Sequence, residues 1–251
     1  MKILVTGARG FIGRNLIEEL GKNKEVQIFK YAKDTDPQTL RYFTNECDFL
    51  FHLAAVHRPK DEAEFNKVNH HFFADLLEML RSKKNACPVL FTSSTQADQN
   101  NAYGKSKLAA EKALKKHSEI INSRAIIYRL TNTFGRYAKP NDHSVVATFC
   151  YNIAHDLPIV ISNPDRVLKL YYIDDVIASL ISHINNDVKP YSDGFYRLPK
   201  ELEYEITLKD LADTIYSFKA IIDKGLAPKN PDIFIEKLYK TYLSSVMLHK
   251  D

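Results

Sequence analysis

The chain has 251 residues, of which 45% are hydrophobic and 26% are charged, a composition typical of a globular protein with a single large core. Its net charge of +4 is small and its lysines are scattered, which argues against a nucleic-acid surface. Cys47, Cys87 and Cys150 lie far apart, so they indicate neither a disulfide framework nor a zinc site. The apolar run of residues 3–5 is too short for the core of a signal peptide, and no later apolar span is long enough for a membrane, so we expect a soluble cytoplasmic protein.

The first half of the chain alternates short apolar runs with amphipathic segments. Strands alternating with helices predict an α/β fold with a parallel, doubly wound sheet. The expected strands cover residues 2–7, 26–31, 47–54, 87–94 and 124–130, and the expected helices cover residues 11–23, 36–45, 61–82 and 103–117.

This alternation is less regular after Asn132. Thr207 with Asp210, and Asp232, are expected to cap the two terminal helices. We expect residues 1–165 to form a nucleotide-binding domain and residues 166–251 to form mainly a substrate-binding subdomain over the carboxyl edge of the sheet. The expected helices cover residues 141–156, 174–184, 207–222 and 231–243, and the expected strands cover residues 157–162 and 194–198.

Three of the eight glycines, Gly7, Gly10 and Gly13, lie between the first expected strand and the first expected helix. In a strand–turn–helix unit this spacing allows a tight turn, a close approach of backbone amides to a pyrophosphate, and close packing of the helix on the strand. The alternative is that the glycines serve helix packing alone. Their position favours a dinucleotide-binding turn.

The end of the second strand bears on the choice of cofactor, because an acidic residue there would bind the ribose of NAD. Lys30 and Lys33 precede any carboxylate at this end, and Arg9 lies in the glycine turn. Cations at this place can pair with the 2′-phosphate of NADP. We therefore expect NADP(H), with NAD(H) as the alternative because strand ends are easily misplaced from sequence.

A tyrosine and a lysine four positions apart, Tyr103 and Lys107, begin the helix 103–117. Side chains at this spacing share one face of a helix. A nearby ammonium and a positive nicotinamide would favour the ionised phenol. We expect Tyr103 to exchange a proton with a carbonyl, Ser94 to orient that carbonyl, and Lys107 also to hold the ribose. The alternative is an exposed amphipathic helix on which the pair has no chemical role.

These motifs together resemble the extended short-chain dehydrogenase/reductases, the NAD-dependent epimerase/dehydratase family, which act on nucleotide sugars. The resemblance covers nearly the whole chain and implies a Rossmann-type sheet with a small C-terminal substrate-binding subdomain. It also implies a homodimer paired through the helices at 61–82 and 103–117. The matching stretches, in chain order, are "GARGFIG", "HLAA", Asn69, "SST", "YGKSK", "YRLTNTFG" and "YIDDV".

The residue patterns and the resemblance together give the expected site. The resemblance implies that Ala54 borders the cofactor and that Asn132 contacts the diphosphate of a sugar nucleotide. Asn141 and Ser144 are expected in the sugar site, with a helix N-terminal cap as an equal alternative. The expected catalytic residues are Ser94, Tyr103 and Lys107; the cofactor residues are Gly7, Arg9, Gly10, Phe11, Ile12, Lys33, Leu53, Ala54, Ala55, Asn69, Tyr103 and Lys107; the substrate residues are Ser94, Thr95, Gln96, Asn132, Asn141 and Ser144.

Residues 93–107 and 139–159 resemble the reductase half of a bifunctional capsule-polysaccharide enzyme. This resemblance implies NADPH-dependent reduction of the 4-keto group of a UDP-linked 6-deoxy-amino sugar, a precursor of capsule or surface polysaccharide. Such relatives continue into a cupin epimerase domain, whereas this sequence ends near where that domain would begin. A stand-alone reductase would therefore need a cupin epimerase in trans.

Two departures from relatives bear on the reaction. Thr95 and Gln96 stand where dehydratase relatives carry an Asp-Glu pair, so 4,6-dehydration is not expected. Leu168 stands where many epimerases carry an arginine. An NAD-dependent nucleotide-sugar 4-epimerase is one alternative, and a non-catalytic nucleotide-binding protein is another, although the complete serine, tyrosine and lysine set argues against the latter.

No metal site is expected, because the candidate histidines lack the i, i+4 spacing of a helical zinc site. Asp174 and Asp175 stand at an expected helix start, where carboxylates favour the helix dipole. The histidines concerned are His52, His57, His70, His71 and His143.

Overall fold

The computed structural model describes residues 1–57, 59–142, 144–186 and 188–247 and divides into two compact units. The first comprises residues 1–130 and 179–197, and the second comprises residues 131–178 and 198–251. The sequence had grouped residues 131–165 with the nucleotide-binding part. In the structure they pack within the second unit, because their strand pairs with a strand of that unit and their helix packs on its two terminal helices.

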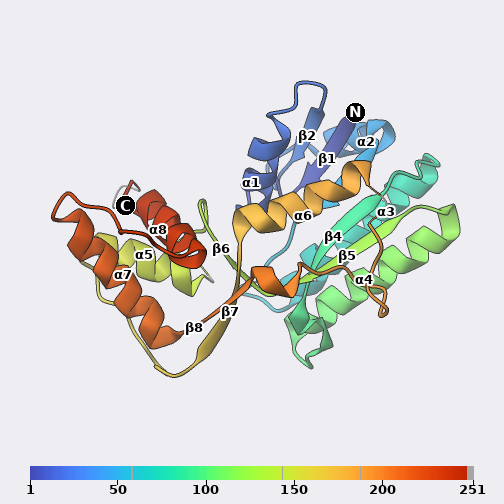
Figure 1. Cartoon of the computed structure of the whole chain (residues 1–251). Helices are drawn as coiled ribbons and strands as arrows, with labels where there is room; N and C mark the ends of the chain where they lie inside the picture. The colour runs from blue at the N-terminus through green and yellow to red at the C-terminus, as the bar shows by residue number, and fades with distance from the viewer. Residues whose placement is uncertain (58, 143, 187, 248–251) are drawn as a thin grey trace. The chain divides into compact units, whose positions relative to one another are not determined.

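Five parallel strands form the sheet of the first unit, in the order β2-β1-β3-β4-β5 (Figure 1). All four residues of β3 and all six of β4 are buried. Helices cover both faces of such a sheet, which explains the nearly continuous apolar runs of its strands. The strands are β1 (Lys2–Thr6), β2 (Gln27–Tyr31), β3 (Phe49–His52), β4 (Val89–Ser94) and β5 (Ala125–Leu130), so the expected doubly wound sheet is confirmed.

One hydrophobic core joins this sheet to three helices. Leu40 of α2, Leu77 of α3 and Leu114 of α4 belong to the same buried cluster as Leu4 and Leu50 of the sheet. The helix expected at 61–82 begins later, as a π-helical segment, η1, that continues directly into α3. The helical elements of the unit are α1 (Phe11–Leu20), α2 (Pro37–Glu46), η1 (Phe65–His71), α3 (Phe72–Ser82), η2 (Thr95–Asp98), α4 (Ala102–Ile121) and the second half of α6 (Ile173–Asn185).

The second unit contains a three-stranded sheet, β6-β7-β8, that the sequence patterns did not predict. β6 (Asn132–Phe134) runs parallel to β7 (Val167–Tyr172), and β8 (Glu203–Thr207) runs antiparallel to β7. Buried Phe149, Ile215 and Leu238 come from three different helices of this unit. These helices are α5 (Val145–Ala154), α7 (Leu208–Ile222) and α8 (Ile233–Val246), and the short helix η3 (Lys200–Leu202) precedes β8.

Two expected strands did not form. Residues 157–162 are irregular, with Val160 83% exposed, because a short apolar run becomes a strand only where a neighbour pairs with it. Residues 194–198 make a single bridge, between Tyr196 and Tyr128 of β5. Both expected caps are confirmed, since Thr207 accepts from the amide of Asp210 and Asp232 accepts from that of Ile235.

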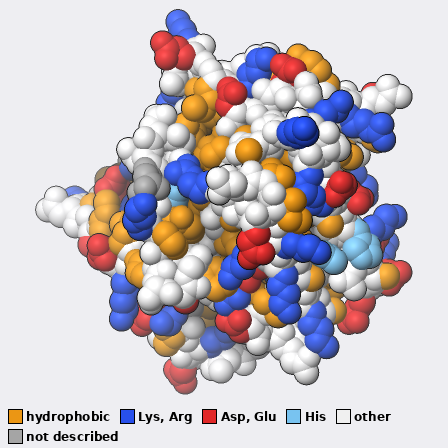
Figure 2. Space-filling view, turned by 90° about the vertical axis from the view of Figure 1, so that its right-hand side faces the viewer, with side chains coloured by type: hydrophobic (Ala, Val, Ile, Leu, Met, Phe, Trp, Pro, Cys, Tyr) orange, Lys and Arg blue, Asp and Glu red, His pale blue; other side chains and the backbone are white. Residues whose placement is uncertain are grey.

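Charged side chains are mixed on the surface. On the face in Figure 2, Lys and Arg lie among Asp and Glu rather than in one continuous patch. Within the described part of the chain, no helix has the length and apolar character needed to cross a membrane.

Candidate functional site

The glycine turn between β1 and α1 is held by close backbone contacts. Gly7 has φ +70°, and a Cβ there would lie 2.7 Å from the nitrogen of Ala54. A Cβ on Gly13 would lie 2.2 Å from the carbonyl oxygen of Gly7. Gly10 is the N-cap of α1 and makes no side-chain hydrogen bond to its amides. The first turn, with Phe11 and Ile12, therefore offers backbone amides to an anion, and the turn fits the pyrophosphate of a dinucleotide.

The turn also contacts the end of β2. The Ala8 amide donates to the carbonyl of Tyr31 at 3.2 Å. Arg9 and Asp34 form an ion pair at 2.5 Å and are 75% and 57% exposed, while Lys33 is exposed beside them. Both a cation and a carboxylate thus lie at the strand end where this fold binds the adenosine ribose of a dinucleotide.

The segment after β3 completes the expected cofactor side. Leu53 donates its amide to the Thr6 carbonyl at 3.2 Å, and Ala54 and Ala55 follow it, half-buried. Asn69 of η1 is 1% exposed. Its side chain donates to the Val56 carbonyl and to Ser106, both at 3.1 Å, and accepts from the Val56 amide at 2.8 Å. This amide group therefore fixes the loop to α4, and direct cofactor contact by Asn69 stays a prediction.

Ser94, Tyr103 and Lys107 come together in the first unit. Ser94 is the last residue of β4, and its hydroxyl lies close enough to the phenol of Tyr103 to lower the pKa of that phenol. Lys107 donates to the carbonyl of Thr92 at 2.9 Å, and its Nζ lies 5.9 Å from the centre of the Tyr103 ring. Strand end and helix start thus bring a hydroxyl, a phenol and an amine together, as the spacing predicted.

Burial sets the protonation of this group. Tyr103 is 9% exposed, and burial raises its pKa to about 12, although the neighbouring Ser94 hydroxyl works in the opposite direction. In the protein alone, removal from water favours the neutral phenol, and the expectation that Lys107 and a positive nicotinamide together favour the phenolate stays a prediction. Burial also lowers the pKa of Lys107 to about 7, against the carboxylate of Glu111, which raises it.

Local packing explains why α4 begins where it does. Asn101 is its N-cap and accepts from the amide of Gly104 at 2.7 Å, a typical cap. A Cβ on Gly104 would lie 2.2 Å from the carbonyl oxygen of Gln96 and 2.7 Å from that of Gln99. The absent side chain of Gly104 therefore lets the helix lie directly against η2, the turn that follows Ser94.

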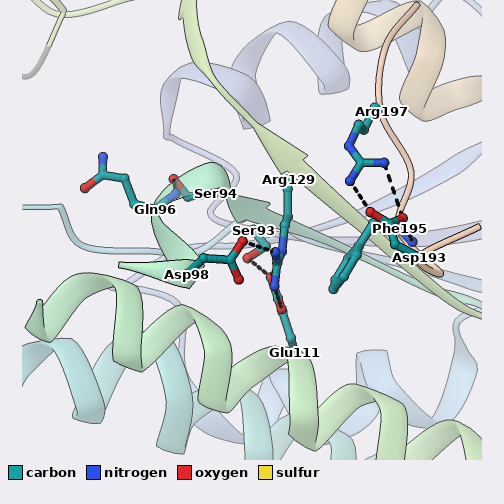
Figure 3. Close-up of polar contacts among 9 residues, drawn as sticks. All are labelled: Ser93, Ser94, Gln96, Asp98, Glu111, Arg129, Asp193, Phe195 and Arg197. Atoms are coloured by element: carbon teal, nitrogen blue, oxygen red, sulfur yellow. Dashed lines mark hydrogen bonds and ion pairs between the residues drawn. The ribbon is translucent and has the colours of Figure 1, made fainter. Parts of the chain in front are cut away.

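A buried ion pair beside this group was not predicted from the sequence. Arg129 of β5 donates from Nε and Nη2 to both carboxylate oxygens of Glu111 of α4, at 2.9 and 2.8 Å. Glu111 also accepts from Ser93 at 2.5 Å, and Arg129 donates from Nη1 to Asp98 at 2.6 Å (Figure 3). The available signal was an arginine inside the buried run 124–130, together with a glutamate one further turn beyond Lys107.

The expected substrate residues fall in both units. Thr95 and Gln96 are exposed on η2 directly after Ser94, and the Gln96 amide donates to the Ser94 hydroxyl at 3.1 Å. Asn132, Asn141 and Ser144 belong to the second unit. Ser144 caps α5 by accepting from the amide of Ala147, and the Asn141 amide donates to Thr148. The prediction that Ser144 caps a helix is thus confirmed, and substrate contact by Asn132, Asn141 and Ser144 stays a prediction.

The remaining polar candidates have structural partners. Asp174 and Asp175 begin α6, where they pair with Arg136 and Lys237. His52 is fully buried, with Nδ1 2.8 Å from the Thr6 hydroxyl. Within the described ranges, no three His, Cys, Asp or Glu side chains are grouped so as to hold a metal ion, and His143 lies outside those ranges.

Comparisons with known proteins identify the family. The model of the NAD dependent epimerase/dehydratase family matches residues 3–192, which include the glycine turn and the Ser94, Tyr103 and Lys107 group. The chain belongs to this family. The fold and the family resemblance expected from sequence are thereby confirmed.

Two curated relatives of this epimerase/dehydratase chain are reductases by name. The UDP-2-acetamido-2,6-beta-L-arabino-hexul-4-ose reductase of Pseudomonas aeruginosa is 37% identical over 244 residues, which cover 97% of this chain and 64% of the relative. The dTDP-4-dehydro-6-deoxyglucose reductase of Escherichia coli is 24% identical over 85% of this chain and 80% of the relative.

Solved structures agree with this assignment. The capsular polysaccharide assembling protein CapF of Staphylococcus aureus is 35% identical, with a TM-score of 0.87 over 98% of this chain and 66% of that one. The UDP-glucuronic acid 4-epimerase of Bacillus cereus, solved with NAD, is 17% identical with a TM-score of 0.83 and shows the shared fold alone. The chain spans about two thirds of the Pseudomonas relative and of CapF.

Proposed function

We propose that the chain is a nucleotide-sugar oxidoreductase that reduces the 4-keto group of a UDP-linked 6-deoxy-amino sugar, a precursor of capsule or surface polysaccharide. The observation that carries the proposal is the Ser94, Tyr103 and Lys107 group at the carboxyl end of β4, in a chain 37% identical to a UDP-hexul-4-ose reductase. The phenol and the serine hydroxyl of this group are the polar groups that a sugar carbonyl requires for protonation.

The raised pKa of Tyr103 suits the direction of reduction. At neutral pH the phenol holds its proton, and it can donate that proton to the carbonyl oxygen as the C4–O double bond becomes a C–OH single bond. Ser94 donates a hydrogen bond to the same oxygen and stabilises the charge that develops on it. A reduced nicotinamide cofactor held there would supply the hydride for the carbonyl carbon. The first turn of α1 would hold its pyrophosphate.

For the cofactor, NADPH is the form that we propose. Arg9 and Lys33 lie exposed beside the end of β2 and offer cations to a 2′-phosphate. The ion pair of Arg9 with Asp34 costs little to open, because both side chains are largely exposed.

An NAD-dependent 4-epimerase is the second candidate, because Asp34 places a carboxylate at the same strand end, where it would accept hydrogen bonds from the ribose of NAD. An epimerase returns the hydride to the same sugar and therefore retains its cofactor. It would carry NAD(H) when purified without added nucleotide, whereas the reductase would be isolated free of it.

Turnover tests the proposal directly. The wild-type chain and Tyr103→Phe are mixed with the 4-keto UDP-sugar and with NADPH or NADH, and the loss of reduced-nicotinamide absorbance is followed. We expect oxidation of NADPH by the wild type and a loss of about 10²–10⁴ in turnover for Tyr103→Phe, with cofactor affinity retained. Full activity in the variant would exclude this role for Tyr103.

A further inference from the structure

We propose that Glu111 and Arg129 are positioning residues for the reaction, because they fix the strand end that carries Ser94 to the helix that carries Tyr103 and Lys107. The inference rests on the proposed function. The four residues Ser93, Asp98, Glu111 and Arg129 are called the Glu111–Arg129 clamp below.

The clamp joins the segments on which the reactive side chains stand. Glu111 lies one helical turn after Lys107, which itself lies one turn after Tyr103 on α4. Ser93, which donates to Glu111, directly precedes Ser94 in β4. Asp98 closes η2, the turn that directly follows Ser94. The clamp therefore holds β4 on one side of Ser94 and η2 on the other, and it ties both to α4.

The guanidinium of Arg129 has the geometry needed to connect α4 with η2. Its guanidinium uses Nε and Nη2 for the two oxygens of Glu111 and Nη1 for Asp98, so one rigid plane connects α4 with η2 (Figure 3). A lysine would supply one point charge and could not reproduce this fork.

The pair of Glu111 and Arg129 is largely buried, whereas Asp98 is exposed. The side chains of Glu111 and Arg129 are 2% and 12% exposed. The ring of Phe195 lies 3.9 Å from the guanidinium carbon, and the turn that carries it is attached to β5 by the Tyr196 amide, which donates to the Ile127 carbonyl at 2.9 Å. A buried ion pair of this kind is weak support for stability alone, since apolar side chains could replace it. Its connection to three catalytic segments supplies a specific reason for its presence.

The clamp also places a negative charge near Lys107. The titratable groups that the structure places against Lys107 are Tyr103 and Glu111 of α4 and His52 of β3, while β4 contributes the Thr92 carbonyl and the Phe91 ring. The carboxylate of Glu111 raises the pKa of Lys107, so it helps to keep the ammonium protonated.

Glu111→Gln and Arg129→Lys test the proposal by kinetics with the keto-sugar and NADPH. In each variant we expect kcat to fall by about 10²-fold, the loss that small misplacements of reacting groups cause, with little change in KM. In Glu111→Gln the fall of kcat at high pH should begin at a lower pH than in the wild type. Arg129→Lys keeps the carboxylate, so its pH profile should stay nearer to that of the wild type.

Two further variants separate positioning from stability. Asp98→Asn removes an exposed partner of Arg129 and should lower kcat partially in a folded protein. Arg197→Gln removes the neighbouring exposed ion pair with Asp193 (Figure 3) and should leave kcat unchanged. If Glu111→Gln and Arg129→Lys lower Tm but leave kcat and the pH profile at wild-type values, the clamp is structural and the proposal fails.

Hydrogen–deuterium exchange gives a readout that needs no substrate. In Glu111→Gln the amides of residues 95–107 should exchange faster than in the wild type, while those of α7 and α8 should not change. If the wild type reduces no keto-sugar, the proposed function fails. The exchange measurement still tests whether Glu111 and Arg129 hold residues 95–107 in place. Unchanged exchange in residues 95–107 would overturn it.

Discussion

Lys107, a proposed site residue, opposes folding through the burial of its ammonium. Its side chain is 2% exposed, and burial holds its pKa at about 7, far below the ordinary 10.5. The unfolded chain therefore binds this proton more tightly than the folded protein does. The destabilising effect of burying the ammonium is at its full size below pH 7, and it disappears as the pH rises toward 10.5.

Lys107→Met should accordingly change stability in a pH-dependent way. Relative to the wild type, we expect its largest gain in Tm below pH 7 and a steady decrease of that gain as the pH rises toward 10.5. Thermal unfolding of both proteins across this range measures the difference. Lys105→Met, on an exposed position of the same helix, is the matched control. A difference in Tm that does not vary with pH would contradict the prediction.

At the scale of elements, the contact between α4 and η2 carries the geometry of the site. The helix begins at the Asn101 cap and passes η2 at Gly104, where the carbonyl oxygens of Gln96 and Gln99 leave no room for a side chain. Tyr103 and Ser94 lie on either side of this contact. A small displacement of one element would therefore separate the two hydroxyls.

Gly104→Ala tests whether turnover depends on the contact between α4 and η2. The added methyl group must displace backbone, so we expect a loss of about 1–3 kcal/mol in the free energy of unfolding and a larger relative loss in kcat. Urea unfolding and turnover measure the two effects. Lys105→Ala, at the next and exposed position, should alter neither, and wild-type turnover in Gly104→Ala would show that the contact is not needed.

At the scale of the whole molecule, the homodimer expected through α3 and α4 remains a prediction. The family resemblance implies pairing through these helices, and Leu108 is only half-buried on α4 in a single chain. Light scattering should give twice the 28.8 kDa of one chain. Leu108→Asp should shift the mass to that of a monomer, whereas Lys116→Asp should not, because Lys116 is already exposed in a single chain. A wild-type monomer would refute the expectation.

Sequence alone determined the parts that depend on local pattern. The alternation of apolar runs and amphipathic segments gave the parallel sheet, because that pattern follows from burial on both faces. The glycine triplet and the Tyr103 and Lys107 spacing predicted the two halves of the site, because a tight turn and a helix face are set by neighbours in the chain. The caps at Thr207 and Asp232 were predictable for the same reason.

Tertiary structure alone decided what depends on distant partners. The sheet β6-β7-β8 was not predicted because a short strand is defined by the strands that it pairs with. Residues 157–162 did not form a strand because no neighbouring strand pairs with them. Burial raises the pKa of Tyr103 in the protein alone, an effect that the spacing of Tyr103 and Lys107 did not indicate. Glu111 and Arg129 are eighteen positions apart and meet only when α4 and β5 pack in the folded unit, so no local spacing could have indicated their ion pair.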